Sequence, residues 1–572
     1  MTPHILHQLR RLSEHHFSRL KLALLLPTAT TPEELGRETW VHHRFGTVAS
    51  SEDLQRISAS TASEALLILP DGERESTSLA SASFGYLTLR RINPTIDITI
   101  AMAGKAYPRL KKFSHMLQIG WDKRQGGAPL PTTLSEIDFR ASSLSNAIVH
   151  EDFTLILQQL LTPPQAGASA LQAAEWSGEV RYDSAGWLLA SAAAQRPLRQ
   201  LLPSLALRGV TLLALIDDRQ QIQPIYSLKR GGGVGFKVIG VIGVAISNNA
   251  LCGELAYELR QEAVDLPQVV APLPLSAQRG SRELRLLIIG WAGGVPKLLK
   301  NLSSEYQSIQ LTIIDHQDGG ECQAHQHYLQ SWLAAEEPAM QERVTMQMVA
   351  WNMSDMELLA PHLGSCDVAL LAAPSSIDCA GFSHITTILS HLVAIADDLT
   401  APPRIITLMH DEVQAERLQQ ELDHAASAVE IDVMVPDALY GSYIAHHLYH
   451  RHSAESESSR QINRALHQAI NDLMINDSAH ELFSIQLLEA EDELPEQAEL
   501  LFQQLFDQQR IWIGYRLDSG ISVAPPPTAQ LLQRLFPQPS SFVSARQQRL
   551  LINPFGNPLT AQEWSHHRLH IS

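Results

Sequence analysis

The stretch "LLIIGWAGGVPKLLKNL", residues 286–302, joins an apolar run to a glycine-rich turn and then to apolar residues at helical spacing. A buried strand that passes through glycines into a helix is typical of the first βα unit of a Rossmann-like sheet. In nucleotide-binding proteins these glycines let the backbone approach a phosphate, and the helix N-terminus adds positive potential. The stretch therefore indicates an α/β unit and leaves two interpretations of its turn, a phosphate loop or a tight connection that binds nothing.

The same stretch belongs to an internal repeat. Residues 295–316 match residues 2–27, with Pro296 over Pro3 and Leu302 over Leu9, and each match is an amphipathic helix leading into an apolar strand. Residues 41–70 run parallel to 344–374 as a strand, a short helix and an apolar strand that ends in proline. Residues 93–102 pair with 401–410, and 211–225 pair with 511–526.

Strands that alternate with helices predict parallel βαβ units, so the fold class is α/β. We predict two Rossmann-like, doubly wound parallel-sheet units, each followed by a small α+β domain. The predicted boundaries are 1–161 and 283–452 for the Rossmann-like units and 171–270 and 462–572 for the small domains. The second Rossmann-like unit has a strand and glycine turn before its first helix, at 284–294, but the first copy begins at Met1 with the helix. We therefore expect the first unit to be truncated, without its first strand and phosphate loop.

Composition narrows the class of protein. At 572 residues the chain is too long for one core, and 45% hydrophobic residues can fill several. The net charge of −18 disfavours a nucleic-acid partner, because such binding needs Lys and Arg to neutralise phosphates. Four cysteines without a CxxC pair suit a reducing cytoplasm, and we expect neither a secretory signal nor membrane insertion.

The order of a Rossmann-like unit, a small unit and a second copy of both resembles tandem RCK domains (regulators of potassium conductance), also found in Trk-type potassium-uptake regulators. "LLIIGWAGG" together with "IWIGYRLDSGISVAPPP" (511–527) is similar to CASTOR/POLLUX-type ion channels, which have a Gly-Trp turn and a "GYRL" strand followed by "PP". Those channels carry transmembrane helices ahead of the tandem, which this chain does not show. The resemblance implies a cytosolic, ligand-responsive assembly, and some relatives bind Ca²⁺ in their rings.

The candidate ligand site is the glycine turn. Gly290, Trp291, Gly293 and Gly294 lie between strand and helix, and Asp315 ends the next strand, where an acidic residue can hold a ribose hydroxyl. A nucleotide of the NAD or ATP type is the expected ligand if one binds. Against it, "GWAGGV" is not G-x-G-x-x-G, so the tight turn is the favoured interpretation.

Four other patterns have weaker functional readings. The stretch at 316–327 offers His316, Asp318, Cys322, His325 and His327 to a metal, but it reads as a solvated, loop-like insertion. "HHLYHRH" (446–452) has four histidines that can respond to pH, with an exposed helix end favoured. The glycine cluster at 229–240 suits an anion nest or, preferably, a hairpin, and Asp217, Asp218 and Asp518 lie in turns without an EF-hand pattern.

Three functions remain open at this point. The leading hypothesis is a non-catalytic regulatory protein that self-assembles, as a dimer or a higher ring, and controls a potassium or other cation channel or transporter in trans. It would be cytoplasmic and peripheral to a membrane complex. The alternatives are an NAD-dependent oxidoreductase that uses the Gly290 turn and a purely structural assembly protein; no catalytic motif supports an enzyme.

Overall fold

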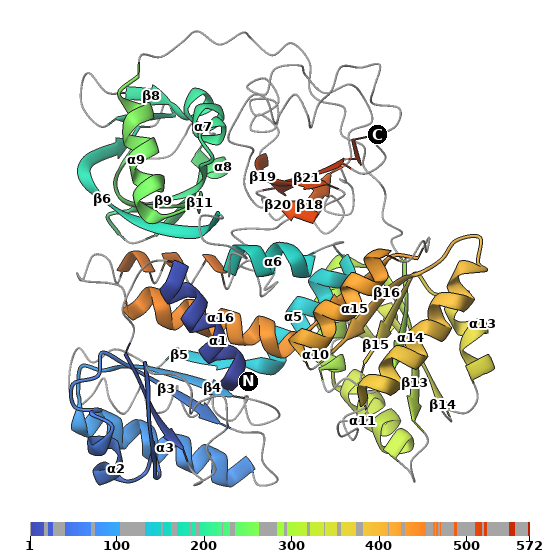
Figure 1. Cartoon of the computed structure of the whole chain (residues 1–572). Helices are drawn as coiled ribbons and strands as arrows, with labels where there is room; N and C mark the ends of the chain where they lie inside the picture. Colours follow the sequence, from blue (N-terminus) through green and yellow to red (C-terminus); the bar gives the residue numbers. More distant parts are fainter. Residues whose placement is uncertain are drawn as a thin grey trace. The chain divides into compact units, whose positions relative to one another are not determined.

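A computed structural model of the chain gives the architecture (Figure 1). It describes residues 2–15, 21–26, 40–69, 75–102, 132–149, 153–161, 169–183, 186–189, 195–219, 221–228, 235–261, 283–290, 294–316, 321–336, 338–351, 356–372, 381–409, 411–424 and 429–452, with short pieces of the region beyond 460. By their internal contacts, Met1–Arg140 and Tyr440–Glu455 form one compact body, and Ala141–Leu439 and Ser456–Ser572 form another.

The second Rossmann-like unit contains a six-stranded sheet in which every neighbouring pair is parallel. Its order is β14-β13-β12-β15-β16-β17, so the first strand in sequence is central and the order is 3-2-1-4-5-6. The strands are β12 (Glu283–Ile289), β13 (Ser308–His316), β14 (Val344–Trp351), β15 (Val368–Leu371), β16 (Arg404–Leu408) and β17 (Ile431–Met434). This is the doubly wound sheet that the sequence predicts.

Helices lie on both faces of this sheet (Figure 1). They are α10 (Val295–Glu305), α11 (Glu321–Ala335), α12 (Pro338–Arg343), η3 (Met356–Leu358), α13 (Leu359–Leu363), α14 (Gly381–Asp397), α15 (Glu412–His424) and the start of α16 (Pro436–His452). Buried strand residues such as Leu287 and Leu371 share a core with Leu389 and Leu392 of α14. Strands covered on both faces need continuous apolar runs, which explains the pattern of 286–289.

The described elements of the first Rossmann-like unit correspond to those of the second that follow β12. Its strands form two separate parallel sheets, β1-β2 and β3-β4-β5. The strands are β1 (Leu22–Leu26), β2 (Val41–Phe45), β3 (Glu64–Leu69), β4 (Asp97–Met102) and β5 (Thr132–Ser135), with helices α1 (Thr2–His15), α2 (Ser51–Arg56), α3 (Glu75–Ile92) and α5 (Glu136–Val149). In the part of the chain that the structure describes, no strand joins β1 to β3. The truncation of this unit stays a prediction.

The small unit that follows is built on an antiparallel sheet of order β10-β9-β11-β6-β7-β8. Its strands are β6 (Ala170–Tyr182), β7 (Trp187–Leu189), β8 (Gln195–Pro197), β9 (Thr211–Asp217), β10 (Ile222–Pro224) and β11 (Phe236–Ala245). Helices α6 (Phe153–Leu161), α7 (Leu198–Leu207), α8 (Ile225–Leu228) and α9 (Asn248–Leu259) accompany it. Strands β9 and β10 confirm the strand, turn and strand predicted for 211–225.

The second small unit is described through its strands. Its sheet has the order β18-β21-β19-β20, with β22 beside β21 and every pairing antiparallel. The strands are β18 (Gln486–Leu488), β19 (Arg510–Leu517), β20 (Gly520–Ser522), β21 (Gln548–Pro554) and β22 (His570–Ile571). Strands β19 and β20 occupy the repeat position of β9 and β10. Among the described helices, none is long and apolar enough to span a bilayer.

Candidate functional site

The candidate site lies where the strand order of the second Rossmann-like sheet reverses, between β12 and β15. In open α/β sheets, ligands bind outside the carboxyl ends of the strands at this point. Gly290 follows β12, and its N–H donates to the carbonyl of Ile314 at 2.8 Å. The N–H of Ala372, directly after β15, donates to the carbonyl of Ile289 at 2.8 Å. The backbone at the carboxyl ends of β12 and β15 is therefore fixed from both neighbouring strands.

Gly290 is required by the geometry of this turn. Its φ is +87°, in the left-handed region that side chains disfavour. A Cβ at this position would lie far inside 3.0 Å of the carbonyl oxygen of Ala372. Gly294 differs, because its φ is −102° and an added Cβ would meet nothing nearer than the Cβ of Ala141 at 3.9 Å. Trp291 and Gly293 of the predicted loop lie outside the described residues.

The N-terminus of α10 faces the same connection. Gly294 is its N-cap and supplies no side chain to the backbone N–H groups of the first turn. Pro296 stands at the start of the helix, as the sequence predicts, and lacks an N–H. Uncapped N–H groups at the start of a helix favour an anion. This end of α10 therefore has the chemistry of a phosphate site.

Asp315 is the penultimate residue of β13 and is 6% exposed. Its Oδ2 lies 2.7 Å from Nδ1 of His325, which comes from α11. The carboxylate is thus held in one orientation at the end of the strand next to β12. Sequence reasoning placed Asp315 but missed His325 as its partner, because nothing in the spacing of ten residues indicates that contact.

The expectation of a loop at 316–327 is wrong for most of that stretch. His316 ends β13, and Cys322, His325 and His327 lie in helix α11. Burial, and secondarily the charge of Asp315, raise the pKa of the Cys322 thiol. Across the described positions, no group of three His, Cys, Asp or Glu side chains converges as a metal site would require. Asp318 lies outside those positions.

The expectation of an exposed helix end at 446–452 is wrong for its first two histidines. His446 and His447 of α16 are 1% and 4% exposed. Nε2 of His447 lies 3.2 Å from the hydroxyl of Thr99 on β4, in the core of the first Rossmann-like unit. Near them, Tyr443 stacks on Phe139 with ring centroids 5.3 Å apart. This half of α16 is a packing element of that unit.

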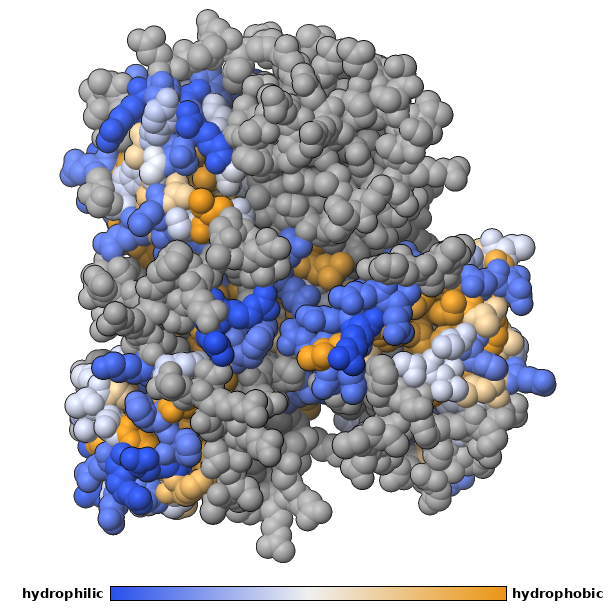
Figure 2. Space-filling view, in the orientation of Figure 1, coloured by the Kyte–Doolittle hydropathy of each residue, from blue (hydrophilic) through white to orange (hydrophobic). Residues whose placement is uncertain are grey.

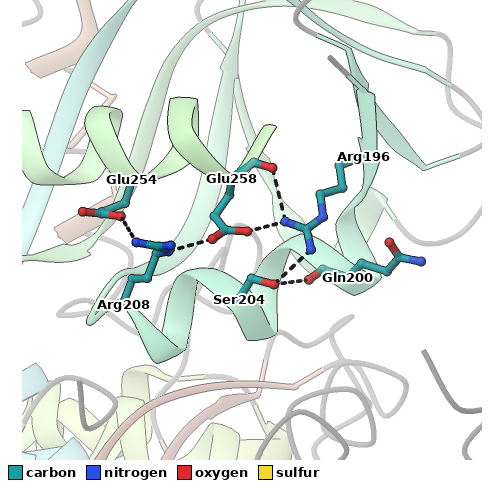
Figure 3. Close-up of polar contacts among 6 residues, drawn as sticks. All are labelled: Arg196, Gln200, Ser204, Arg208, Glu254 and Glu258. Carbon is teal, nitrogen blue, oxygen red and sulfur yellow. Dashed lines mark hydrogen bonds and ion pairs between the residues drawn. The ribbon is translucent and has the colours of Figure 1, made fainter. Parts of the chain in front are cut away.

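A charged network ties together the small unit that carries β6–β11 (Figure 3). Glu258 of α9 is 5% exposed, forms an ion pair with buried Arg196 of β8, and accepts from Nε of Arg208 at 2.7 Å. Arg208 also reaches Glu254 at 3.2 Å, and its guanidinium lies 4.0 Å from the ring centroid of Tyr257. The hydrogen bond to Glu258, and then the charges of Glu258 and Glu254, raise the pKa of Arg208. The network joins α9 to β8 and to the end of α7, which is a structural role.

The remaining candidates are turns. Asp217 accepts from the N–H groups of Arg219 and Gln221 at 2.9 and 2.8 Å, so its carboxylate closes the β9–β10 turn. Asp218 follows it in that turn, and Asp518 lies outside the described residues. Phe236, near the end of the 229–240 cluster, begins β11. The described part of that cluster therefore leads into a strand, as expected.

No protein-family model matches the chain, and no curated protein does. Among solved structures, it is similar to the human SLO3 gating ring, with a TM-score of 0.55 and 12% identity over 94% of this chain and 95% of that one. The chain therefore shares the fold of that structure.

Two further structures match more loosely. They are the RCK domain of GsuK (TM-score 0.37, 12% identity, 98% of this chain and 92% of that one) and the GsuK channel bound to NAD (TM-score 0.37, 11% identity, 98% and 77%). Their superposition is too poor to add to the conclusion. The more specific resemblance to CASTOR/POLLUX-type channels stays a prediction.

Proposed function

We propose that the chain is a non-catalytic regulatory protein of the tandem RCK type. It senses a ligand with its second Rossmann-like unit and controls a potassium or other cation channel or transporter made by a separate polypeptide. The observation that carries this proposal is a gating-ring fold whose strand-order reversal holds Gly290, the uncapped start of α10 and the oriented carboxylate of Asp315. No residue at this end of the sheet is assigned a catalytic role.

The ligand that suits these groups is a nucleotide of the NAD or ATP type. The start of α10 would take the phosphates, since its N–H groups carry partial positive charge. Asp315 would accept from the ribose hydroxyls, and His325 keeps its carboxylate from turning away. Ca²⁺ is the second ligand to be tested, because relatives by resemblance bind it.

The protein would self-assemble as a dimer or a higher ring. This assembly would act at the cytoplasmic side of a membrane complex. A ligand would change the assembly only if it bound one arrangement of the subunits more tightly than another. The four-domain division at 1–161, 171–270, 283–452 and 462–572 is part of this proposal.

The test is thermal unfolding of the purified chain with ADP, ATP, NAD, NADH and Ca²⁺ in turn. A ligand at about 100 times its Kd should stabilise the protein by roughly 2.7 kcal/mol. Asp315→Asn should weaken nucleotide binding about tenfold or more, because a charged acceptor is lost. Asp367→Asn is the matched control: Asp367 lies at the opposite end of the same sheet, where it binds Arg285 at 2.5 Å.

Three outcomes would contradict the proposal in different ways. Stabilisation by no ligand, with assembly in light scattering unchanged throughout, would favour the purely structural protein. Steady oxidation of NADH with a carbonyl substrate would favour the oxidoreductase. Purification from native membranes without any channel or transporter would remove the control in trans while leaving the ligand site standing.

A further inference from the structure

In the first Rossmann-like unit, the described strands β1 and β3 belong to two separate sheets, and we name the place between these sheets the open strand position. In the second unit the corresponding place holds β12, which pairs with β13 on one side and β15 on the other. In the first unit β1 pairs with β2 and β3 pairs with β4, and the described residues place no strand between them. Leu25 of β1 nevertheless packs against the same core as Leu67 of β3. The two sheets therefore share one hydrophobic core, as the two sides of the second sheet would if β12 were left out.

The apolar residues of β1 are less buried than those of β13, the corresponding strand of the second unit, as expected for a strand beside an open position. The repeat register sets Val41 over Val344, and hence three apolar residues of β1 over three of β13. In β1 these residues are half-buried: Leu22, Leu24 and Leu26. In β13 their counterparts are buried to 1% exposure or less: Ile309, Leu311 and Ile313.

Strand β3 shows the same difference. Aligned on the prolines that end the two apolar runs, Ala65 and Leu66 correspond to Ala369 and Leu370 of β15. Ala65 and Leu66 are half-buried, whereas their counterparts are fully buried at 0% exposure. In the view of Figure 2, apolar surface is visible among hydrophilic side chains in the region that Figure 1 labels α2, α3 and β3.

We propose that the open strand position accepts a β-strand from another polypeptide, parallel to both β1 and β3. The strand must be apolar on both faces, because both faces of a doubly wound sheet are covered. Five residues, roughly 16 Å of extended chain, would match the length of β1. Unpaired strand edges bind extended segments through main-chain hydrogen bonds, and alternate side chains supply the specificity.

The second unit also gives the register. Leu287 of β12 lies beside Thr312 and Ala369, whose counterparts in the first unit are Leu25 and Ala65. A residue at the centre of the incoming strand should therefore lie beside Ala65. Adjacent strands are about 4.7–4.9 Å apart, which is within the Cα separation that a disulfide spans.

The experiment uses the full chain and, as the probe, a peptide with the sequence of β12 and its glycine, residues 283–290, carrying added lysines for solubility. At saturation we expect amide hydrogen exchange in β1 and β3 to slow at least tenfold, with β13 and β15 unchanged. A scrambled peptide should have no effect. A peptide with cysteine in place of Leu287 should form a disulfide with an Ala65→Cys chain, and one with cysteine in place of Leu284 should not.

Each contrary result overturns the proposal. Unchanged exchange in β1 and β3 would show that the position does not accept a strand. Full protection of both strands without peptide would show that a segment of this chain already fills it. Disulfide formation by both cysteine peptides would mean that the peptide binds without a fixed register. The inference does not depend on ligand sensing, so failure of the nucleotide test leaves it standing.

Discussion

Replacing Gly290 with alanine tests whether the turn after β12 has the geometry on which the candidate site depends. At φ +87°, an alanine costs roughly 1–2 kcal/mol of backbone strain. Its Cβ would also lie far inside 3.0 Å of the Ala372 carbonyl oxygen, so β12 or the residues after β15 must move. Displacing packed backbone costs at least as much again, about 1–3 kcal/mol. We expect a total loss of about 3 kcal/mol.

Gly294→Ala is the matched control, since its φ is negative and its Cβ would have room. A loss of about 3 kcal/mol should lower the melting temperature of the second Rossmann-like unit by roughly 6–12 °C, whereas Gly294→Ala should shift it little. Because a chain with several domains does not unfold in one step, hydrogen exchange of β12 and β15 should accompany the melting curve. Equal stability of the two variants would refute the close approach of Gly290 to Ala372.

Two further predictions concern the small unit and the half-buried thiols of Cys252 and Cys366. Glu258→Ala leaves Arg196 buried without its charge partner, so α9 and β8 should lose about 3–5 kcal/mol of protection in hydrogen exchange, whereas Glu254→Ala should cost at most about 1 kcal/mol. An effect of Glu254→Ala as large as that of Glu258→Ala would contradict the network. Burial raises the pKa of Cys252 to about 11 and that of Cys366 to about 12, from 9.0. At pH 8, alkylation followed by mass spectrometry should be about 100-fold slower for Cys252 and about 1000-fold slower for Cys366 than in the unfolded chain. Just above pH 9 these thiols ionise in the unfolded chain but not in the folded chain, so the free energy of unfolding should fall as the pH rises from 9 towards 11–12. Rapid labelling of the folded protein, or a stability that rises over this pH range, would contradict the prediction.

Much of the fold was predictable because the core follows apolar runs. The two copies share proline at the first helical turn and apolar strands at the same intervals, so their elements could be matched without contacts. The glycine at 290 could be singled out for the same reason, since a strand that turns at once into a helix needs a residue with positive φ.

What the sequence did not reveal depends on contacts between distant segments. Helix α11 is polar on most of its surface, with Tyr328 exposed and Leu329 buried, so its apolar stripe was too narrow to indicate a helix. The burial of His447 depends on Thr99, far away in the sequence. The orientation of Asp315 depends on a helix that was expected to be a loop.

The strand order has a consequence for the way the two copies form. In the second unit the central strand β12 is synthesised first. The chain from Ile289 to Val368 must then be synthesised before β15 can pair with the second edge of β12. At roughly 5–20 residues per second this interval lasts several seconds, during which chaperones can act. In the first unit the described strands are consecutive neighbours, β1 beside β2 and β3 beside β4, so each of these pairs can form as soon as its second strand has been synthesised.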